Sequence, residues 1–258
     1  MNTLTLLQAR SSSTRLPGKV LKTLMGKPMI LQQIERIKKA QHIGTLCLVT
    51  STDTSDDELA SIVGSAGIPV YRGSLDDVLD RFYMAALPYK ADTIVRLTGD
   101  CPLADPEIID QAIQSFHKEK VDYLGNGLPP SYPDGMDVEV FRFSALETAW
   151  NHAKLSSERE HVTPYIYKNP ERFHLANLTH ATNLSDLRLT VDEACDFELV
   201  EKIYQALMPV EPDFLLPDIL ELLARHPEWL ELNQKITRNE GYLKSIKQDT
   251  NSLKGIQS

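Results

Sequence analysis

The chain has 258 residues, of which 42% are hydrophobic and 24% are charged, which is an ordinary composition for a globular protein. The 36 acidic residues outnumber the 27 basic ones, and the net charge of −9 argues against a general role in binding nucleic acid or membrane surfaces. Three scattered cysteines without a C-x-x-C pair argue against a zinc site or a disulfide framework and indicate a reducing compartment. We find no apolar run near ~18 residues and no signal-peptide pattern, so we expect a cytoplasmic protein without membrane insertion.

Strands and helices alternate along the first half of the chain. Apolar runs predict strands at 3–9, 45–51, 69–73 and 92–100. Helical spacing predicts helices at 27–40, 55–67, 76–89 and 105–119. This βαβ alternation predicts an α/β fold with a mostly parallel sheet flanked by helices.

The second half is less regular. Strands are predicted at 137–143, 173–178 and 187–192, and helices at 144–155, 157–169, 195–207 and 214–233. Because no Gly/Ser/Pro linker divides the chain, we expect a single domain at 1–238, with a nucleotide half at about 1–120 and an acceptor half at about 121–238. The remaining segment, 239–258, is polar and is expected to fray.

A polar loop follows the first predicted strand, in the stretch LLQARSSSTRLPGKV at 6–20. Ligands of parallel sheets bind at the carboxyl ends of the strands. Cations such as Arg10 and Lys19, expected to be little buried, together with the hydroxyl groups of this loop suit a polyphosphate. A solvated surface loop is the alternative. The stretch does not fit the P-loop pattern, and no dinucleotide-binding fingerprint is found elsewhere.

Two aspartates, Asp100 and Asp192, end predicted strands. Mg²⁺ typically takes one or two carboxylates together with substrate phosphates, so this pair is a candidate metal site. Each aspartate also has a structural explanation: Asp100 as a turn residue, and Asp192 or Asp196 as a helix N-cap. The acidic stretch at 134–139 is explained by a β-turn that opens a strand.

Several segments together resemble a known family. The segments LLQARSSSTRLPGKVL, TGDCPLADPEII and LTVDEACDFELV are similar to the motifs of the acid-sugar cytidylyltransferases, which include the 3-deoxy-manno-octulosonate and acylneuraminate enzymes. The segments YRGSLDDVLDRF, YPDGMDVEVF and SEREHVTPYI resemble the SpsF-like branch, which is associated with spore-coat and other surface polysaccharides. The resemblance covers roughly residues 3–205.

This resemblance implies a nucleotidyltransferase fold that moves CMP from CTP to a sugar, expected to be acidic, with release of pyrophosphate. It implies a nucleotide site made of Gln8, Ala9, Arg10, Ser12, Ser13, Arg15, Lys19 and Arg72. It implies catalytic roles for Arg10, Lys19, Asp100 and Asp192, the two aspartates holding Mg²⁺ or Mn²⁺. A homodimer through about 125–185 is also implied. Gln8 stands where the family commonly has proline, and its amide suits the reading of a pyrimidine edge.

Three other functions compete with this interpretation. A glycosyltransferase with a related fold usually carries an Asp-x-Asp motif, which GDCPLAD is not. A sugar-1-phosphate nucleotidyltransferase usually opens on a Gly-rich loop, whereas this chain has Ala9-Arg10. A non-catalytic relative would not need the intact cations and aspartates. We therefore expect CTP and a small sugar as the partners.

Overall fold

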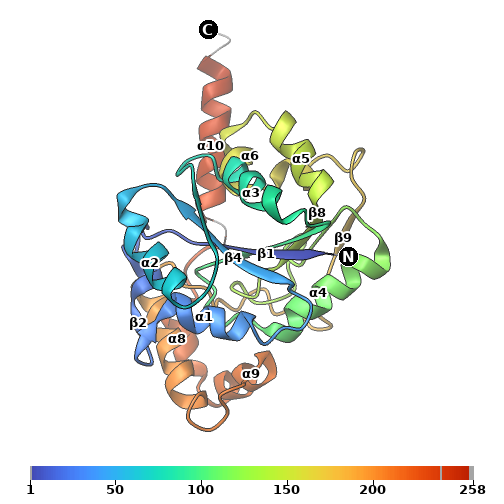
Figure 1. Ribbon diagram of the computed structural model, residues 1–258. Coiled ribbons are helices and arrows are strands. Elements are labelled where there is room, and N and C mark those ends of the chain that lie inside the picture. Colours follow the sequence, from blue (N-terminus) through green and yellow to red (C-terminus); the bar gives the residue numbers. More distant parts are fainter. Residues whose placement is uncertain (1, 239, 256–258) are drawn as a thin grey trace.

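A seven-stranded sheet forms the centre of the molecule in the computed structural model, which describes residues 2–238 and 240–255 (Figure 1). The strand order is β5-β4-β1-β6-β8-β7-β9. The strands are β1 (Thr3–Gln8), β4 (Thr45–Ser51), β5 (Val70–Gly73), β6 (Thr93–Thr98), β7 (Tyr123–Gly125), β8 (Glu139–Arg142) and β9 (Leu175–Asn177). The first four are parallel, and only β8 runs antiparallel to its neighbours. The predicted α/β class with a mostly parallel sheet is confirmed.

Helices cover both faces of the sheet. One face packs against α1 (Met29–Ile37), α2 (Asp57–Ser65), α4 (Pro106–Glu119), α8 (Ala194–Leu207) and α9 (Leu216–Arg225). The other packs against α3 (Val78–Ala86), α5 (Phe143–His152) and the segment from α6 (Ser156–His161) to α7 (Pro164–Tyr167). A two-stranded sheet, β2 (Thr23–Leu24) with β3 (Lys27–Pro28), precedes α1.

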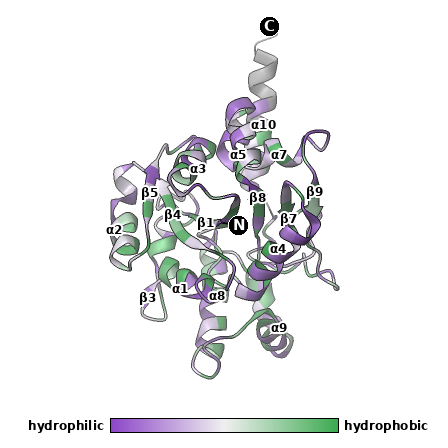
Figure 2. Cartoon of the chain, turned by 45° about the vertical axis from the view of Figure 1, so that its right-hand side comes forward, coloured by the Kyte–Doolittle hydropathy of each residue, from purple (hydrophilic) through white to green (hydrophobic). Residues whose placement is uncertain are grey.

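The two cores follow from side-chain periodicity. Along β1, Leu4 and Leu6 belong to the core with α3, whereas Leu7 belongs to the core with α1, as alternation along a strand requires. In α1, Ile30, Ile34 and Ile37 are buried at helical spacing. Figure 2 shows hydrophobic residues concentrated along strands such as β4, between the helices. Within the described residues, no helix is both long and apolar enough to cross a bilayer.

The segment at 187–192 is not a strand of the sheet, contrary to the prediction. Its backbone donors are used by two loops instead: Leu189 N donates to Asp134 O at 2.7 Å, and Val191 N donates to Asp100 O at 2.8 Å. A bridge between Asp134 and Arg188 completes the contact. The segment therefore ties the loop after β6 to the turn before β8.

Three other predictions need correction. The single helix expected at 157–169 is broken into α6 and α7, because Val162 has a φ of 72° and Pro164 has no N–H to donate. The helical segment at 214–233 is interrupted at Pro227, where 3₁₀ turns follow α9. The tail expected to fray contains α10 (Glu240–Gly255), which begins beside α6 and projects away from the sheet (Figure 1).

We expect the substitution Gly135→Ala to destabilise the chain by about 1–3 kcal/mol in urea unfolding. Gly135 has a φ of 103°, and a Cβ added there would lie 2.5 Å from Thr190 N, against the segment at 187–192. The matched control is Gly64→Ala in α2, where the nearest atom lies 3.9 Å away. The control should be neutral or slightly stabilising. Equal effects of the two substitutions would show that the close approach at Gly135 is not required.

Candidate functional site

Two adjoining cavities of about 280 and 360 Å³ open beyond the carboxyl ends of β1 and β6. Both are lined by Gln8, Arg15, Thr98, Asp100, Asp192 and Gly241. The smaller one, which we call the cationic cavity, adds among others Ala9, Arg10, Ser13, Lys19 and Lys244. The larger one, the acidic cavity, adds among others Arg96, Asp134, Asp137, Glu139, His161, Thr163 and Glu240. The two cavities thus meet at the two aspartates singled out in the sequence.

The loop that follows β1 forms one wall of the cationic cavity. Its start is held by the buried Asp56, whose carboxylate accepts a hydrogen bond from Ser11 N at 2.6 Å. Its end folds back, with Gly18 N donating to Ser11 O at 3.0 Å. Arg10 is exposed, as expected, so its guanidinium is available to a ligand.

Lys19 lies at the bottom of this cavity and is only 8% exposed, so the expectation of slight burial is wrong for this residue. Its ammonium donates to Asp192 Oδ1 at 2.9 Å, to Asp100 Oδ2 at 3.3 Å and to Val191 O at 2.7 Å. Burial alone would lower the pKa of Lys19, but the two carboxylates outweigh it and raise the pKa. Lys19 is therefore a fixed positive charge that holds both aspartates in one place.

Both aspartates take part in more than a turn or a cap. Burial opposes ionisation of Asp100, but Lys19 and hydrogen bonds outweigh it and lower the pKa of that carboxyl. Asp192 also pairs with Arg15 and Arg188, each at 3.0 Å. The N-cap of α8 is Glu193, so neither Asp192 nor Asp196 is the N-cap, contrary to the expectation. Asp196, at the third position of the helix, accepts from the backbone N–H groups of Asp192 and Glu193.

Two of the predicted nucleotide residues lie outside the linings of these cavities. Ser12 is exposed and lines neither of them. Arg72 also lines neither, because its guanidinium, on the edge strand β5, donates to Ser51 O at 2.8 Å and pairs with Asp57 at 2.7 Å. Local acceptors thus hold Arg72, and its expected place in the nucleotide site is not supported by this geometry.

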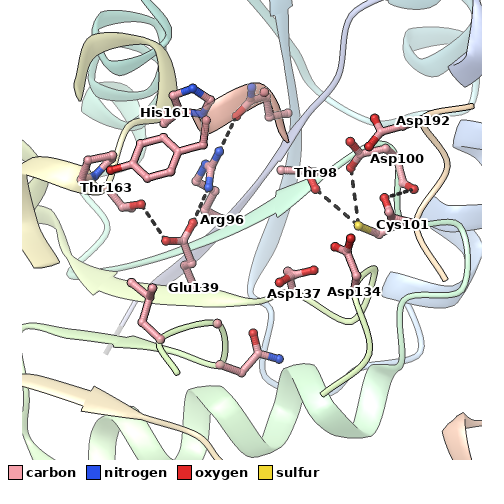
Figure 3. Close-up of a pocket in the computed structure, with 18 of the residues that line it drawn as sticks. Arg96, Thr98, Asp100, Cys101, Asp134, Asp137, Glu139, His161, Thr163 and Asp192 are labelled. Atoms are coloured by element: carbon pink, nitrogen blue, oxygen red, sulfur yellow. Dashed lines mark hydrogen bonds and ion pairs between the residues drawn. The ribbon is translucent and has the colours of Figure 1, made fainter. Parts of the chain in front are cut away.

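The acidic cavity contains residues that the sequence interpretation treated as structural (Figure 3). Glu139, on β8, pairs with Arg96 and accepts hydrogen bonds from Thr163 Oγ1 at 2.6 Å and Tyr123 Oη at 2.7 Å. Asp137, two residues before the start of β8, lines the same cavity as Glu139. Their spacing, inside a segment already noted for its resemblance, was the signal that could have identified them.

Asp134 and Asp137 lie close together at the turn before β8. Burial, followed by the nearby charge of Asp137, raises the pKa of Asp134 to about 7, although Arg238 and Arg188 oppose the shift. Arg188 donates to Asp134 Oδ2 at 2.8 Å and also reaches Asp192 and Asp196. One arginine thereby connects the acidic turn with the aspartates at the cavity junction.

The first turns of α10 line both cavities. Glu240 pairs with Arg15 at 3.2 Å, and Ser245 Oγ lies 3.0 Å from His161 Nε2. Just before α10, Arg238 pairs with Asp137 at 2.6 Å. The end of the chain therefore contributes directly to the site.

Comparison with known proteins identifies close relatives. A family model described as "Cytidylyltransferase" matches residues 4–213. The spore coat polysaccharide biosynthesis protein SpsF of Bacillus subtilis is 32% identical over 235 residues, covering 86% of this chain and 94% of SpsF. The 3-deoxy-manno-octulosonate cytidylyltransferase of Geobacter sulfurreducens is 38% identical over 239 residues, which cover 80% of this chain and 94% of the relative. A solved cytidylyltransferase structure from Leptospira borgpetersenii has a TM-score of 0.86 at 32% identity and covers 92% of this chain and 100% of that one.

We expect Lys19→Met to destabilise the chain at pH 7 by about 1–3 kcal/mol, less than the loss of a fully buried partner because the carboxylates keep some solvent contact. The pKa of Asp100 is lowered in the folded state, so its stabilising contribution exists above about pH 4 and is lost as the pH falls. Without Lys19 that contribution disappears. The difference between variant and wild type in urea unfolding should therefore be smaller at pH 4 than at pH 7.

The control for this experiment is Lys244→Met. Lys244 lines the same cavity, but its side chain is 63% exposed, so its removal should cost at most about 0.5 kcal/mol. A loss of stability in Lys19→Met that is independent of pH would contradict the assigned ion pairs.

Proposed function

The chain belongs to the cytidylyltransferase family, and on this premise we propose that it transfers CMP from CTP to a sugar hydroxyl and releases pyrophosphate. The observation that carries the proposal is the buried Lys19, which joins Asp100 and Asp192 below a loop of cations. The likeness to SpsF supports a sugar used in surface polysaccharide synthesis. The homodimer expected from the resemblance stays a prediction.

The cationic cavity suits a triphosphate. Arg10, Arg15, Lys19 and Lys244 line it together with the hydroxyl of Ser13. Charged donors form stronger hydrogen bonds to phosphate oxygens than neutral donors do. We therefore assign the triphosphate to this cavity and the sugar to the acidic cavity.

Gln8 suits the recognition of a pyrimidine. Its Oε1 accepts a hydrogen bond from Arg96 at 3.1 Å, which fixes the orientation of the amide. The amide nitrogen of Gln8 can then donate toward the cavity. Cytosine offers two neighbouring acceptors, O2 and N3, that match such a donor.

A divalent metal fits the donor set at the junction of the cavities. Asp100 and Asp192 would hold Mg²⁺ or Mn²⁺, which prefer oxygen ligands, and the remaining ligands would come from phosphates and water. In the described part of the chain, no group of three or more histidine, cysteine or acidic side chains is arranged to hold a metal, so the protein supplies few ligands. When bound, the ion would neutralise charge that develops on the phosphates.

The chain's residues contribute mainly position and charge to the reaction. The sugar oxygen attacks the α-phosphorus and forms a new P–O bond, while the bond between the α-phosphorus and the oxygen that bridges to the β-phosphorus breaks. Pyrophosphate leaves with that oxygen, and the hydroxyl proton passes to water. The negative charge on the phosphate oxygens and on the departing pyrophosphate faces Arg10, Arg15 and Lys19. Preorganised charges of this kind stabilise a transition state without reorganisation during the reaction.

We expect Asp100→Asn and Asp192→Asn each to reduce kcat at least about 100-fold when the rate is measured on folded protein, below the melting temperature of the variant, since each variant also loses an ion pair with Lys19. Each substitution keeps the shape but removes a charge from the proposed metal site. The double variant should be hardly slower than the single ones, because residues that act as one unit are not additive. The measurement is kcat with CTP across a Mg²⁺ titration, with the exposed Asp186→Asn as control. Near-normal turnover of either single variant would remove that residue from the metal site.

Calorimetric titration tests the nucleotide cavity. CTP should bind more tightly than the other three nucleoside triphosphates. Arg10→Ala should weaken CTP binding by about 1.5–3 kcal/mol, or roughly 10- to 150-fold, because a charge-assisted phosphate contact is lost. Arg225→Ala, an exposed arginine of α9, should leave the affinity unchanged. Equal affinity for all four nucleotides would argue against the proposed donor.

A further inference from the structure

The acidic cavity has an unusual charge distribution for a site that would receive an acidic sugar. Its lining includes six carboxylates, namely those of Asp100, Asp134, Asp137, Glu139, Asp192 and Glu240. Asp134, Asp137 and Glu139 come from one short stretch and form what we call the acidic wall, which lies apart from the proposed metal ligands (Figure 3). This wall lines the cavity to which we assign the sugar under the proposed function.

The cations that line the same cavity are already paired. Arg96 forms an ion pair with Glu139 through one terminal nitrogen, and its other terminal nitrogen donates a hydrogen bond to Gln8 Oε1. Arg15 pairs with Asp192 at 3.0 Å and with Glu240 at 3.2 Å. A carboxylate on the sugar would have to displace one of these partners.

His161 does not add a positive charge to the cavity. Burial is the main cause that lowers its pKa, so the imidazole is neutral near pH 7. The two cations that pair with the acidic turn, Arg188 and Arg238, are not part of the lining. All six carboxyl groups have a cationic partner, but Lys19, Arg188 and Arg238 do not line the cavity. Acidic groups therefore outnumber cations in the lining, even though the raised pKa of Asp134, about 7, leaves that group only partly ionised near neutral pH.

A buried donor of Arg96 lies at this cavity. The Nε–H group of Arg96 is buried and has no hydrogen-bond partner among the described residues, and Arg96 lines the cavity. Since the charge of this guanidinium is balanced by Glu139, the remaining N–H suits a neutral oxygen such as a hydroxyl. Nor is the wall a metal cage, because the described residues contain no group of three or more metal-ligating side chains arranged to hold an ion.

We propose that the acceptor is a sugar without a carboxylate, which presents hydroxyl or amino groups to the acidic wall. Hydroxyl and ammonium groups donate hydrogen bonds that carboxylates accept, whereas a sugar carboxylate would meet the like charges of the acidic wall. The inference rests on the proposed transfer from CTP. By this inference, the acceptor of this chain differs in charge from the acidic sugar in the name of its relative from Geobacter sulfurreducens.

A matched pair of acceptors tests the inference with the full chain, CTP and Mg²⁺. 3-Deoxy-manno-octulosonate and its carboxamide differ in the carboxylate alone, and neutral hexoses and hexosamines complete the panel. Pyrophosphate release and product mass are measured. We expect product from at least one acceptor without a carboxylate, and a kcat/KM at least ten times higher for the carboxamide than for the acid wherever this pair is used.

Two results would overturn the inference while leaving the proposed function intact. One is a preference for the acid over its carboxamide. The other is bound CTP without product from any acceptor that lacks a carboxylate. If CTP is not bound at all in calorimetry, the proposed function fails and the inference fails with it.

The variant Glu139→Gln tests whether the acidic wall causes the expected preference for acceptors without a carboxylate. It removes one charge from the wall and leaves Arg96 without its carboxylate, so the kcat/KM ratio of the best non-carboxylate acceptor to the acid should fall at least tenfold. The matched control is Glu147→Gln, whose carboxylate accepts from Tyr83 Oη at 3.2 Å and does not line the cavity. If Glu139→Gln does not fold, Asp137→Asn, at a side chain 38% exposed, replaces it. An unchanged ratio in the folded variant would overturn the inference.

Discussion

The site depends on one ammonium group. Lys19 comes from the loop after β1, Asp100 from the loop after β6, and Asp192 from the segment before α8, yet the three meet in a nearly buried cluster. Two carboxylates brought this close would repel each other without the cation between them. The same contact closes the floor of the cationic cavity and fixes the junction with the acidic cavity. Folding and the arrangement of the site are therefore stabilised by the same interaction.

The first half of the fold was predictable because its signals are local. Buried strands and amphipathic helices alternate there, and the motifs that resemble the cytidylyltransferases, a resemblance that the comparisons confirm, lie in order along the chain. The short strand β7 and the break at Val162 were missed, since three residues or one positive φ leave little periodic signal. The segment at 187–192 was misassigned for a different reason. It has the composition of a strand, but its hydrogen bonds go to two loops that are distant in sequence.

The site was predictable to the extent that its residues stand next to strand ends in recognisable motifs. Gln8, Arg10, Arg15 and the two aspartates do line the cavities. Arg72 does not, because a motif shows neighbours in sequence and not the acceptors that a side chain will find. The acidic wall and α10 were missed because a β-turn and a polar tail have adequate local explanations. Their roles appear only when distant segments are brought together.

The ion pair between Glu240 and Arg15 has a consequence for the proposed binding of a nucleotide, which would exchange one anion for another. Arg15 already shares its charge between Asp192 and Glu240, so a phosphate that reaches it must replace a carboxylate of the protein itself. The affinity measured for a nucleotide is then the difference between two ionic contacts, not the strength of one. Glu240 is the first residue of α10, which lies beyond the part of the chain that the family model covers. Under the proposed function, nucleotide occupancy would be coupled to the position of a helix that follows the residues matched by the family model.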